Sequence, residues 1–423
     1  MGLSRWIRVF SLLAGVWCLQ AGGPILALKV ARVLDPASGL DARHQILLVE
    51  EGRIRAVGSE LVIPKDAQIV DLGNRTLMPG LMDAHTHLCA TVDGKWDLGD
   101  FWIMAIQRPQ GFRAIQGAAH ARQMVEAGFT TVRDMGNAGE YLDMDLEKAI
   151  RFGIVPGPTI IPSGRIIAPF GGQFWDNPAN KEHLQNPEYR FADSLDELRK
   201  AIRENIYYGA KVIKIVVDGK PYAYSTEDIH FVVKEASEAG LKVAAHVQTE
   251  RGARRAIEAG VASIEHAWVL TDEDLALAKK QGVALVSTDF TEKILRAADG
   301  DVTADRAKAL HRRYVDRLRR ARLAGVNVVF GTDIMVDIEG ETRGILALEY
   351  MDSFLEAGYT PLEILAAMTG KAATLLGVAE ERGAIRPGMA ADLVAMVGDP
   401  VLDIHQLTHI DFVMRNGRMI KRP

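Results

Sequence analysis

A repeated pattern of helix, glycine and apolar strand organises the middle of the chain. An amphipathic stretch ends in Ala-Gly or Gln-Gly, and a run of apolar, mostly β-branched residues follows each pair, at residues 127–128, 239–240, 259–260, 281–282 and 324–325. Glycine just past a helix end accepts the left-handed backbone that closes the last turn. Unbroken apolar strands are typical of sheets that are covered on both faces. The pattern therefore predicts parallel strands joined by crossover helices.

Two helix starts are marked by polar residues. Ser225 is followed by Asp228, and Thr271 is followed by Asp274. A serine or threonine with an acidic residue three positions later is typical of a capping box, in which each side chain binds the other residue's backbone N–H. We predict that helices begin at these two positions.

Eight apolar segments fit the strands of such a sheet, at residues 81–87, 129–134, 159–163, 211–216, 242–246, 263–266, 283–287 and 328–333. Side chains that can bind a metal stand at the C-terminal ends of the first, fourth, fifth, sixth and eighth segments. They can meet only if the sheet curls on itself. We therefore predict an α/β fold, a (β/α)₈ TIM barrel, in which the working residues lie at the C-terminal ends of the strands.

Two β-rich pieces flank the predicted barrel, at residues 28–77 and 386–421. Neither can close a core alone, so we expect them to pair in a small β-sandwich. The predicted organisation is a signal peptide at residues 1–23, the first part of the sandwich at 24–78, the barrel at 79–380 and the second part of the sandwich at 381–423.

The first residues have the character of a secretory signal. A basic start with Arg5 and Arg8 precedes an apolar core and the small residues Ala21, Gly22 and Gly23. The apolar run is shorter than the roughly 20 residues that span a membrane, although an uncleaved anchor and lipidation at Cys18 are alternatives. We expect a periplasmic or secreted protein with no stable membrane insertion after the signal is removed.

Composition narrows the function classes. The chain has 423 residues, of which 48% are hydrophobic and 25% charged, as in a globular enzyme. A net charge of -5 offers no broad basic surface and argues against a nucleic-acid partner. Beyond Cys18 the only cysteine is Cys89, which excludes an intramolecular disulfide and is interpreted as a small buried residue.

One set of side chains near the predicted strand ends can bind a metal: His85, His87, Lys214, His246, His266 and Asp333. His85 and His87 are separated by one residue, so a strand turns both imidazoles to one face, where they can hold one ion. Each member alone has an ordinary structural interpretation, such as a hydrogen-bonded core histidine or an ion-paired lysine. Together, in this order, they indicate a divalent-metal site. The other histidines are interpreted as surface or packing residues: His44, His120, His183, His230, His311, His405 and His409.

These residues and their flanking phrases resemble the amidohydrolase superfamily. The phrases are Pro79-Gly80-Leu81-Met82-Asp83-Ala84-His85-Thr86-His87, Gly331-Thr332-Asp333 and Gly383-Ala384-Ile385-Arg386-Pro387-Gly388. Within the superfamily the chain is similar to the imidazolonepropionase-related group, especially its exported Xaa-Pro dipeptidase-like and carboxypeptidase-like members.

The resemblance implies a binuclear metal centre. It assigns His85, His87 and Asp333 to one ion and His246 and His266 to the other, and it implies that Lys214, carboxylated on its amine, bridges them. Two Zn²⁺ ions are expected, sharing a hydroxide that attacks a carbonyl, with Asp333 as the proton shuttle. The implied activity is hydrolysis of an amide or peptide bond in a small molecule, a dipeptide or an N-acyl amino acid.

Substrate recognition is less defined by the sequence. Tyr222, Tyr224, Arg165 and Arg343 are candidates for contacts with an oxyanion or a carboxylate, although structural or solvated roles are the alternatives. Aromatic residues in two expected loops, at 91–109 and 165–194, suggest an apolar pocket. Alternative functions are an amidase or lactonase for another small amide or ester, such as an aromatic xenobiotic, and a non-catalytic oligomeric scaffold. We also expect a homo-oligomer.

Overall fold

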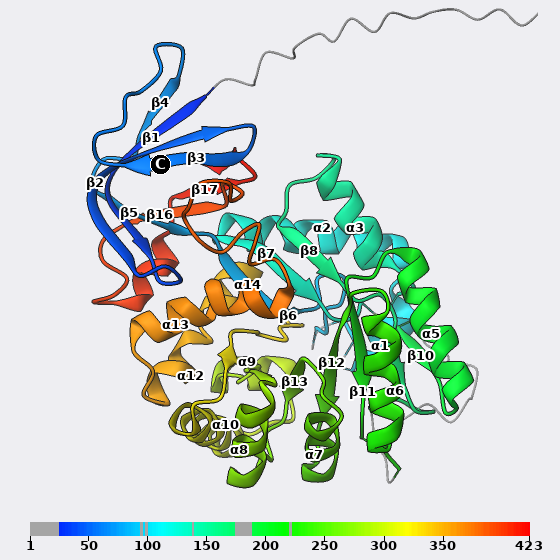
Figure 1. Ribbon diagram of the computed structural model, residues 1–423. Helices are drawn as coiled ribbons and strands as arrows, with labels where there is room; N and C mark the ends of the chain where they lie inside the picture. Colours follow the sequence, from blue (N-terminus) through cyan, green and yellow to red (C-terminus); the bar gives the residue numbers. More distant parts are fainter. Residues whose placement is uncertain (1–24, 94–95, 98–99, 138, 174–187, 220–221) are drawn as a thin grey trace, which may run out of the picture.

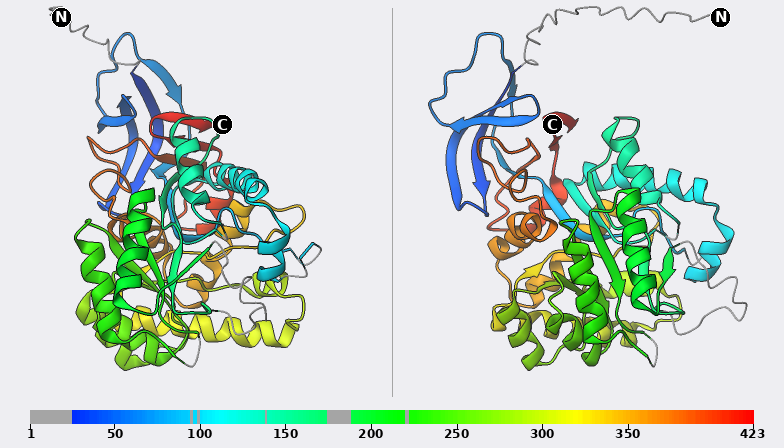
Figure 2. Two further views of the ribbon diagram at one scale, coloured as in Figure 1. Left: turned by 90° about the vertical axis from the view of Figure 1, so that its right-hand side faces the viewer. Right: turned by 45° about the vertical axis from the view of Figure 1, so that its right-hand side comes forward.

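The protein has a larger body of parallel strands and helices, with a mainly antiparallel sheet beside it (Figures 1 and 2). The computed structural model describes residues 25–423 except 94–95, 98–99, 138, 174–187 and 220–221. The expected signal peptide, with Cys18, lies outside the described residues. In the described part of the chain, no helix combines the length and the apolar character that crossing a membrane requires.

Ten parallel strands carry the larger body, and all eight predicted segments contain one of them. One sheet has the order β6-β7-β8 and the other β10-β9-β11-β12-β13-β14-β15. Their bounds are β6 (Leu81–Thr86), β7 (Phe129–Asp134), β8 (Thr159–Pro162), β9 (Ile166–Ala168), β10 (Tyr189–Phe191), β11 (Val212–Val216), β12 (Lys242–Val247), β13 (Ser263–His266), β14 (Ala284–Val286) and β15 (Val328–Val329).

The closed barrel is confirmed only in part, because the two parallel sheets do not form one continuous ladder. Isolated backbone bonds join their edges: Lys211 N–H donates to Pro162 O at 2.8 Å, and Ala84 N–H donates to Phe330 O at 2.9 Å. The eighth strand also ends four residues earlier than predicted. Beyond Val329 the backbone bonds to another segment, since Phe330 N–H donates to Ala367 O at 3.2 Å, and the last residue of the predicted strand, Asp333, is left-handed with a φ of 57°.

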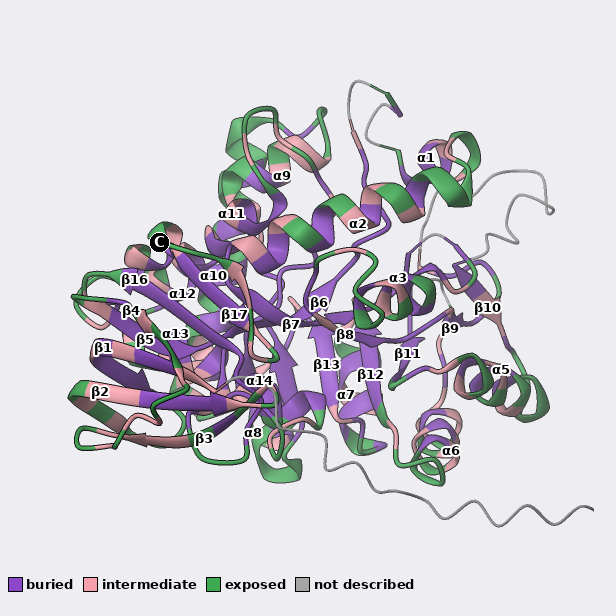
Figure 3. Cartoon of the chain, turned by 90° about the horizontal axis from the view of Figure 1, so that it is seen from above, coloured by how far each residue is buried: buried purple, intermediate pink, exposed green. Residues whose placement is uncertain are grey.

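Helices cover the outside of the parallel strands, as crossover connections require (Figures 1 and 3). Figure 3 shows the strands buried and the outer helix faces exposed. The helices are α1 (Phe101–Gln107), α2 (Gln110–Glu126), α3 (Leu142–Arg151), α5 (Leu195–Tyr208), α6 (Thr226–Ser237), α7 (Glu250–Glu258), α8 (Asp272–Gln281), α9 (Glu292–Ala298), α10 (Ala304–Ala324), α11 (Arg343–Leu348), α12 (Met351–Glu356), α13 (Pro361–Ala367) and α14 (Gly370–Leu376). Helix α1 and strands β9 and β10 lie within stretches that the sequence analysis interprets as loops.

Both predicted capping boxes are confirmed, at the starts of α6 and α8. We expect Ser225→Ala to lower the free energy of unfolding by about 1 kcal/mol, because the backbone N–H of Asp228 loses its side-chain acceptor. Denaturant unfolding measures the change. Ser237→Ala in the last turn of α6 is the matched control, and an equal effect in both variants would contradict the capping role.

The chain ends pair in one eight-stranded sheet with the order β18-β17-β16-β5-β1-β2-β3, in which β4 also pairs with β1. Strand β16 runs antiparallel to β5, so the C-terminal segment completes the N-terminal one as predicted. The sheet is a single connected one with its own apolar core, which includes Leu47 and Phe412. Its strands are β1 (Leu26–Asp35), β2 (Leu40–Glu50), β3 (Arg53–Gly58), β4 (Gln68–Asp71), β5 (Arg75–Pro79), β16 (Leu393–Val397), β17 (Phe412–Arg415) and β18 (Arg418–Lys421).

Candidate metal centre

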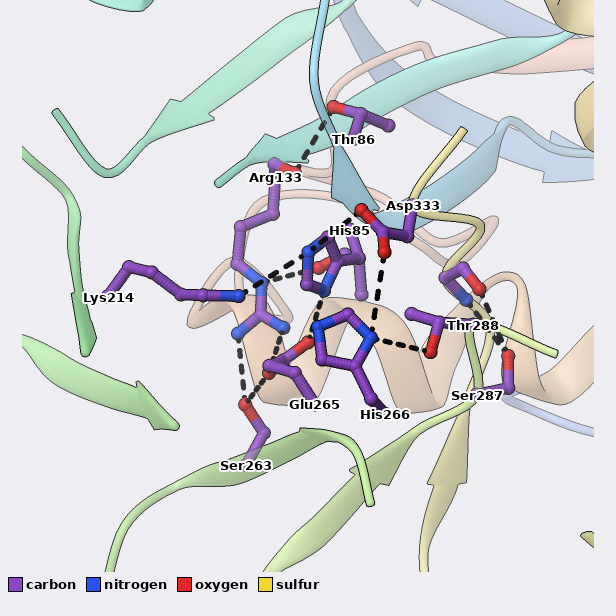
Figure 4. A network of polar contacts seen from close by, with 12 residues as sticks. His85, Thr86, Arg133, Lys214, Ser263, Glu265, His266, Ser287, Thr288 and Asp333 are labelled. Carbon is purple, nitrogen blue, oxygen red and sulfur yellow. Dashed lines mark hydrogen bonds and ion pairs between the residues drawn. The ribbon is translucent and has the colours of Figure 1, made fainter. Parts of the chain in front are cut away.

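Asp333 lies in the middle of a group of imidazoles. Its Oδ1 is 3.0 Å from His87 Nε2 and 3.6 Å from His85 Nε2, and its Oδ2 is 3.6 Å from His266 Nδ1. Ligand atoms of His85, His266 and Asp333 all lie within 4.8 Å of one another. Side chains from β6, from the end of β13 and from the segment after β15 therefore converge, and Figure 4 shows His85, His266 and Asp333 together.

Lys214 and His246 complete the cluster from the neighbouring strands β11 and β12. Lys214 Nζ is 3.4 Å from His85 Nε2, and the rings of His246 and His266 have centroids 4.4 Å apart. The parallel pairing of β11, β12 and β13 brings these residues to the same end of the sheet. All six residues singled out from the sequence thus meet, and they are referred to below as the six-residue cluster.

The buried setting of the cluster favours uncharged nitrogen donors. Burial lowers the pKa of Lys214 from 10.5 to about 8, although the carboxylates of Glu265 and Asp333 act in the opposite direction. Burial, followed by neighbouring positive groups, lowers the pKa of His85, His246 and His266 well below the ordinary value. A nitrogen that gives up its proton has a lone pair free for a cation.

His87 differs from the other three imidazoles. Burial disfavours its charged form, but the hydrogen bond and the charge of Asp333 outweigh burial and raise its pKa. Its other nitrogen, Nδ1, lies 2.5 Å from Gly136 O and donates to this carbonyl. The proton on Nδ1 directs Nε2 at Asp333, so Nε2 could bind a cation once the cation replaces the proton that hydrogen-bonds to this carboxylate.

The residues present fit divalent ions. Imidazole nitrogens and a carboxylate are the donors that Zn²⁺ accepts in proteins. His246 Nε2 is buried and has no hydrogen-bond partner among the described residues. Because a buried polar atom without a partner is costly, this nitrogen indicates that a further partner, such as a metal ion, belongs in the site.

Backbone strain accompanies the cluster. His266, Ala267, Thr288 and Asp333 are non-glycine residues with positive φ, between 46° and 66°. All four lie at or just past the C-terminal ends of β13, β14 and β15. Left-handed backbone at such residues costs free energy and is concentrated at functional sites. The strained residues include two members of the cluster, His266 and Asp333.

Several supporting residues were not assigned a role from the sequence. Asp83 accepts hydrogen bonds from Thr332 Oγ1 at 2.7 Å and from His85 N–H at 3.0 Å, and so ties β6 to the segment that carries Asp333. Thr288 Oγ1 is 3.0 Å from His266 Nδ1. Glu265 Oε2 is 2.7 Å from His85 Nδ1. For Asp83 and Glu265 the sequence did contain a signal, because each is a carboxylate within an apolar strand. A buried carboxylate needs partners, which would have indicated a supporting role.

In the described part of the chain, no hydrogen bond or ion pair joins the side chains of the four candidate substrate residues to those of the six-residue cluster. Tyr224 is buried and donates to Ala192 O at 2.6 Å, which is a structural role. Tyr222 is exposed and its hydroxyl bonds to Phe170 O. Arg165 donates to Tyr189 O at 2.5 Å.

Arg343 was expected to contact a substrate carboxylate or to be solvated, and the structure supports neither role. Its side chain is 1% exposed at the start of α11. The guanidinium donates to Ile334 O at 2.8 Å, to Thr91 Oγ1 at 2.7 Å and to Asp337 Oδ1 at 2.9 Å. With three acceptors in the protein, it holds the segment after Asp333 and is not available for a substrate carboxylate.

The aromatic residues expected in a pocket have no described contact with the six-residue cluster. Phe101 and Trp102 are buried in α1, Trp96 is exposed, and Phe174 and Trp175 lie outside the described residues. An aromatic group that the sequence analysis missed adjoins the cluster instead. Trp268, two residues after His266, has its ring centroid 5.2 Å from the imidazole of His266 and stacks on Tyr314 at 4.9 Å.

The remaining histidines and the cysteine agree with packing or surface roles. His120 and His311 are buried and hydrogen-bonded to backbone carbonyls, whereas His405 is exposed between Asp352 and Asp403. His183 lies outside the described residues. Cys89 is buried and free, and burial raises its thiol pKa, which disfavours the thiolate needed for metal binding.

Known proteins share this architecture and sequence. The ochratoxinase of Aspergillus niger is 30% identical over 93% of this chain and 86% of its own length. The imidazolonepropionase of Geobacillus sp. (strain WCH70) is 24% identical over 88% of this chain and 89% of its own length. The crystal structure of a Xaa-Pro dipeptidase with methionine bound in the active site is also similar. It superposes with a TM-score of 0.81 at 26% identity and covers 94% of this chain and 100% of its own. A model of the amidohydrolase family matches residues 76–421, which include every member of the six-residue cluster, and the chain therefore belongs to the amidohydrolase family.

Proposed function

We propose that this protein is a binuclear-metal hydrolase that cleaves the amide or peptide bond of a dipeptide or an N-acyl amino acid. The observation that carries the proposal is the convergence of four imidazoles, one amine of lowered pKa and one carboxylate in a single buried cluster. The names of the similar proteins, ochratoxinase and Xaa-Pro dipeptidase, support amide chemistry. The proposal includes a closed (β/α)₈ barrel, export from the cytoplasm and a homo-oligomeric state.

The chain's own residues have distinct roles in this proposal. His85, His87 and Asp333 would hold one ion, His246 and His266 would hold the other, and Lys214, as a carbamate, would be a ligand to both. When bound, two Zn²⁺ ions supply an activated water and polarise the scissile carbonyl. Lys214 can add CO₂ as a neutral amine, and its lowered pKa of about 8 makes that form accessible near neutral pH.

Asp333 is the proposed proton carrier. It is 8% exposed, the most exposed member of the cluster, and its two oxygens face different imidazoles. A carboxylate in this position can accept a proton from the attacking water and deliver it to the leaving amine. The positive φ of Asp333 holds the carboxylate toward the imidazoles and not along the strand.

A second candidate is an amidase or lactonase that acts on an aromatic amide or ester. The aromatic group of Trp268, Tyr314 and Phe290 favours it, because Trp268 lies against His266 and packs in turn on the other two rings. Aromatic faces bind apolar and aromatic groups of a substrate. Comparison of dipeptides, N-acyl amino acids and aryl amides as substrates separates the two candidates.

Removal of metal tests the proposal as a whole. Purified protein is expected to contain about two equivalents of Zn²⁺ per chain and to lose both the metal and amide hydrolysis when a chelator is added. Elemental analysis with a library of dipeptides and N-acyl amino acids measures both properties. Protein without bound metal, or with hydrolysis that persists after complete chelation, would favour the non-catalytic scaffold or a different chemistry.

A further inference from the structure

Three buried polar side chains link three strands beside the six-residue cluster, and one of the three is the cluster member His85. Arg133 on β7 reaches across the interior and donates from Nη2 to Glu265 Oε1 at 2.8 Å. Glu265 Oε2 lies 2.7 Å from His85 Nδ1. Figure 4 shows this line from guanidinium to carboxylate to imidazole on the side of His85 away from Asp333. Arg133, Glu265 and His85 are at most 2% exposed.

The hydrogen bonds of Glu265 leave one arrangement of protons on His85. An ionised carboxylate only accepts hydrogen bonds, so the proton of the pair lies on His85 Nδ1. The lone pair of His85 is then on Nε2, which faces Lys214 Nζ at 3.4 Å and Asp333 Oδ1 at 3.6 Å. The contact with Glu265 therefore determines both the tautomer and the direction of the imidazole.

Arg133 makes this arrangement stable. A buried carboxylate without a positive partner is strongly disfavoured, and Arg133 supplies the charge. Its Nε also donates to Ala84 O at 2.6 Å, at the residue before His85, and its Nη1 donates to Ser263 Oγ at 3.2 Å. One guanidinium thus holds the partner of His85 and the backbone next to His85 in fixed relation.

We propose that Glu265, held by Arg133, is the positioning residue of the metal centre and fixes His85 with Nε2 presented to the metal. The inference rests on the proposed function, since it assumes that the cluster binds divalent ions. Glu265 is 0% exposed and cannot reach a substrate, and within the cluster its hydrogen bond goes to His85. Ser263, on the same face of β13, supports it with a hydrogen bond to Oε1 at 2.5 Å.

The main test is the Zn²⁺ affinity of Glu265→Gln, measured by competition with a chromophoric chelator. The amide of glutamine cannot accept from both His85 and Arg133: if its oxygen faces Arg133, its NH₂ faces His85 Nδ1 and favours the tautomer with the proton on Nε2. We expect affinity to fall by ~10–100-fold. Asp392→Asn is the matched control, because Asp392 is another buried carboxylate, paired with Arg382 at 2.6 Å on the side of the antiparallel sheet.

Two further measurements separate positioning from folding. The ¹⁵N shifts of labelled histidine in the metal-free protein report the His85 tautomer, which is expected to change in Glu265→Gln and to stay unchanged in Asp392→Asn. Ser263→Ala, a milder variant, should lower Zn²⁺ affinity less than Glu265→Gln. Unchanged Zn²⁺ affinity in Glu265→Gln, or an unchanged His85 tautomer, would overturn the inference. A wild-type protein without Zn²⁺ affinity would instead overturn the proposed function.

Discussion

Replacement of Lys214 with alanine is expected to remove most of the hydrolytic activity, on the order of 10³-fold, and to leave about one tightly bound metal ion per chain. In the proposed centre Lys214, as a carbamate, would be the one protein ligand common to both ions, so its loss would weaken the binding of the second ion. Steady-state kinetics on the best substrate and elemental analysis of the same sample measure the two effects together.

Controls for this variant distinguish chemistry from packing. Lys214 is 1% exposed, so alanine also leaves a cavity, whereas Lys214→Met retains most of the volume without an amine. Both variants are expected to be equally inactive. Lys211→Ala, three residues earlier and exposed, should behave as wild type. Near-normal turnover in Lys214→Met would show that no carbamate is needed.

Much of the fold could be predicted because the sequence repeats its local signals. Ser225 and Thr271 begin helices as expected, and Gly282 and Gly325 close helices with a left-handed backbone. The eight predicted strands lie within two residues of their predicted bounds, except for β15. In β15 the backbone leaves the ladder at Phe330, whose N–H donates to Ala367 O, and a pairing with such a distant residue is not visible in the local sequence.

The six-residue cluster could be predicted for a different reason. Metal-binding side chains are uncommon within apolar strands, and parallel strands bring their C-terminal ends together. The substrate residues lacked such a constraint. Arg343 and Tyr224 were singled out only because they follow strands, and each satisfies backbone carbonyls instead. The role of Glu265 could not be predicted, because its partner Arg133 is 132 residues away in the chain.

Asp333→Asn is the second variant with a large expected effect. The amide keeps an oxygen for the metal but cannot accept a proton at neutral pH, so kcat is expected to fall by ~10²–10⁴-fold with smaller loss of metal. The dependence of kcat/KM on pH should also change, because the variant cannot carry a proton at this position. Kinetics across pH and elemental analysis measure these outcomes.

Asp337→Asn is the matched control for this change, because it lies four residues further along the same segment. Its carboxylate binds Arg343 at 2.9 Å and lies 3.3 Å from His120 Nε2, outside the cluster. Neutralising Asp337 should therefore weaken the anchoring of the segment and lower stability while turnover stays near wild type. If both variants lost turnover equally, the carboxylate of Asp333 would matter only through the position of its loop. A rate of Asp333→Asn close to wild type would exclude Asp333 as the proton carrier.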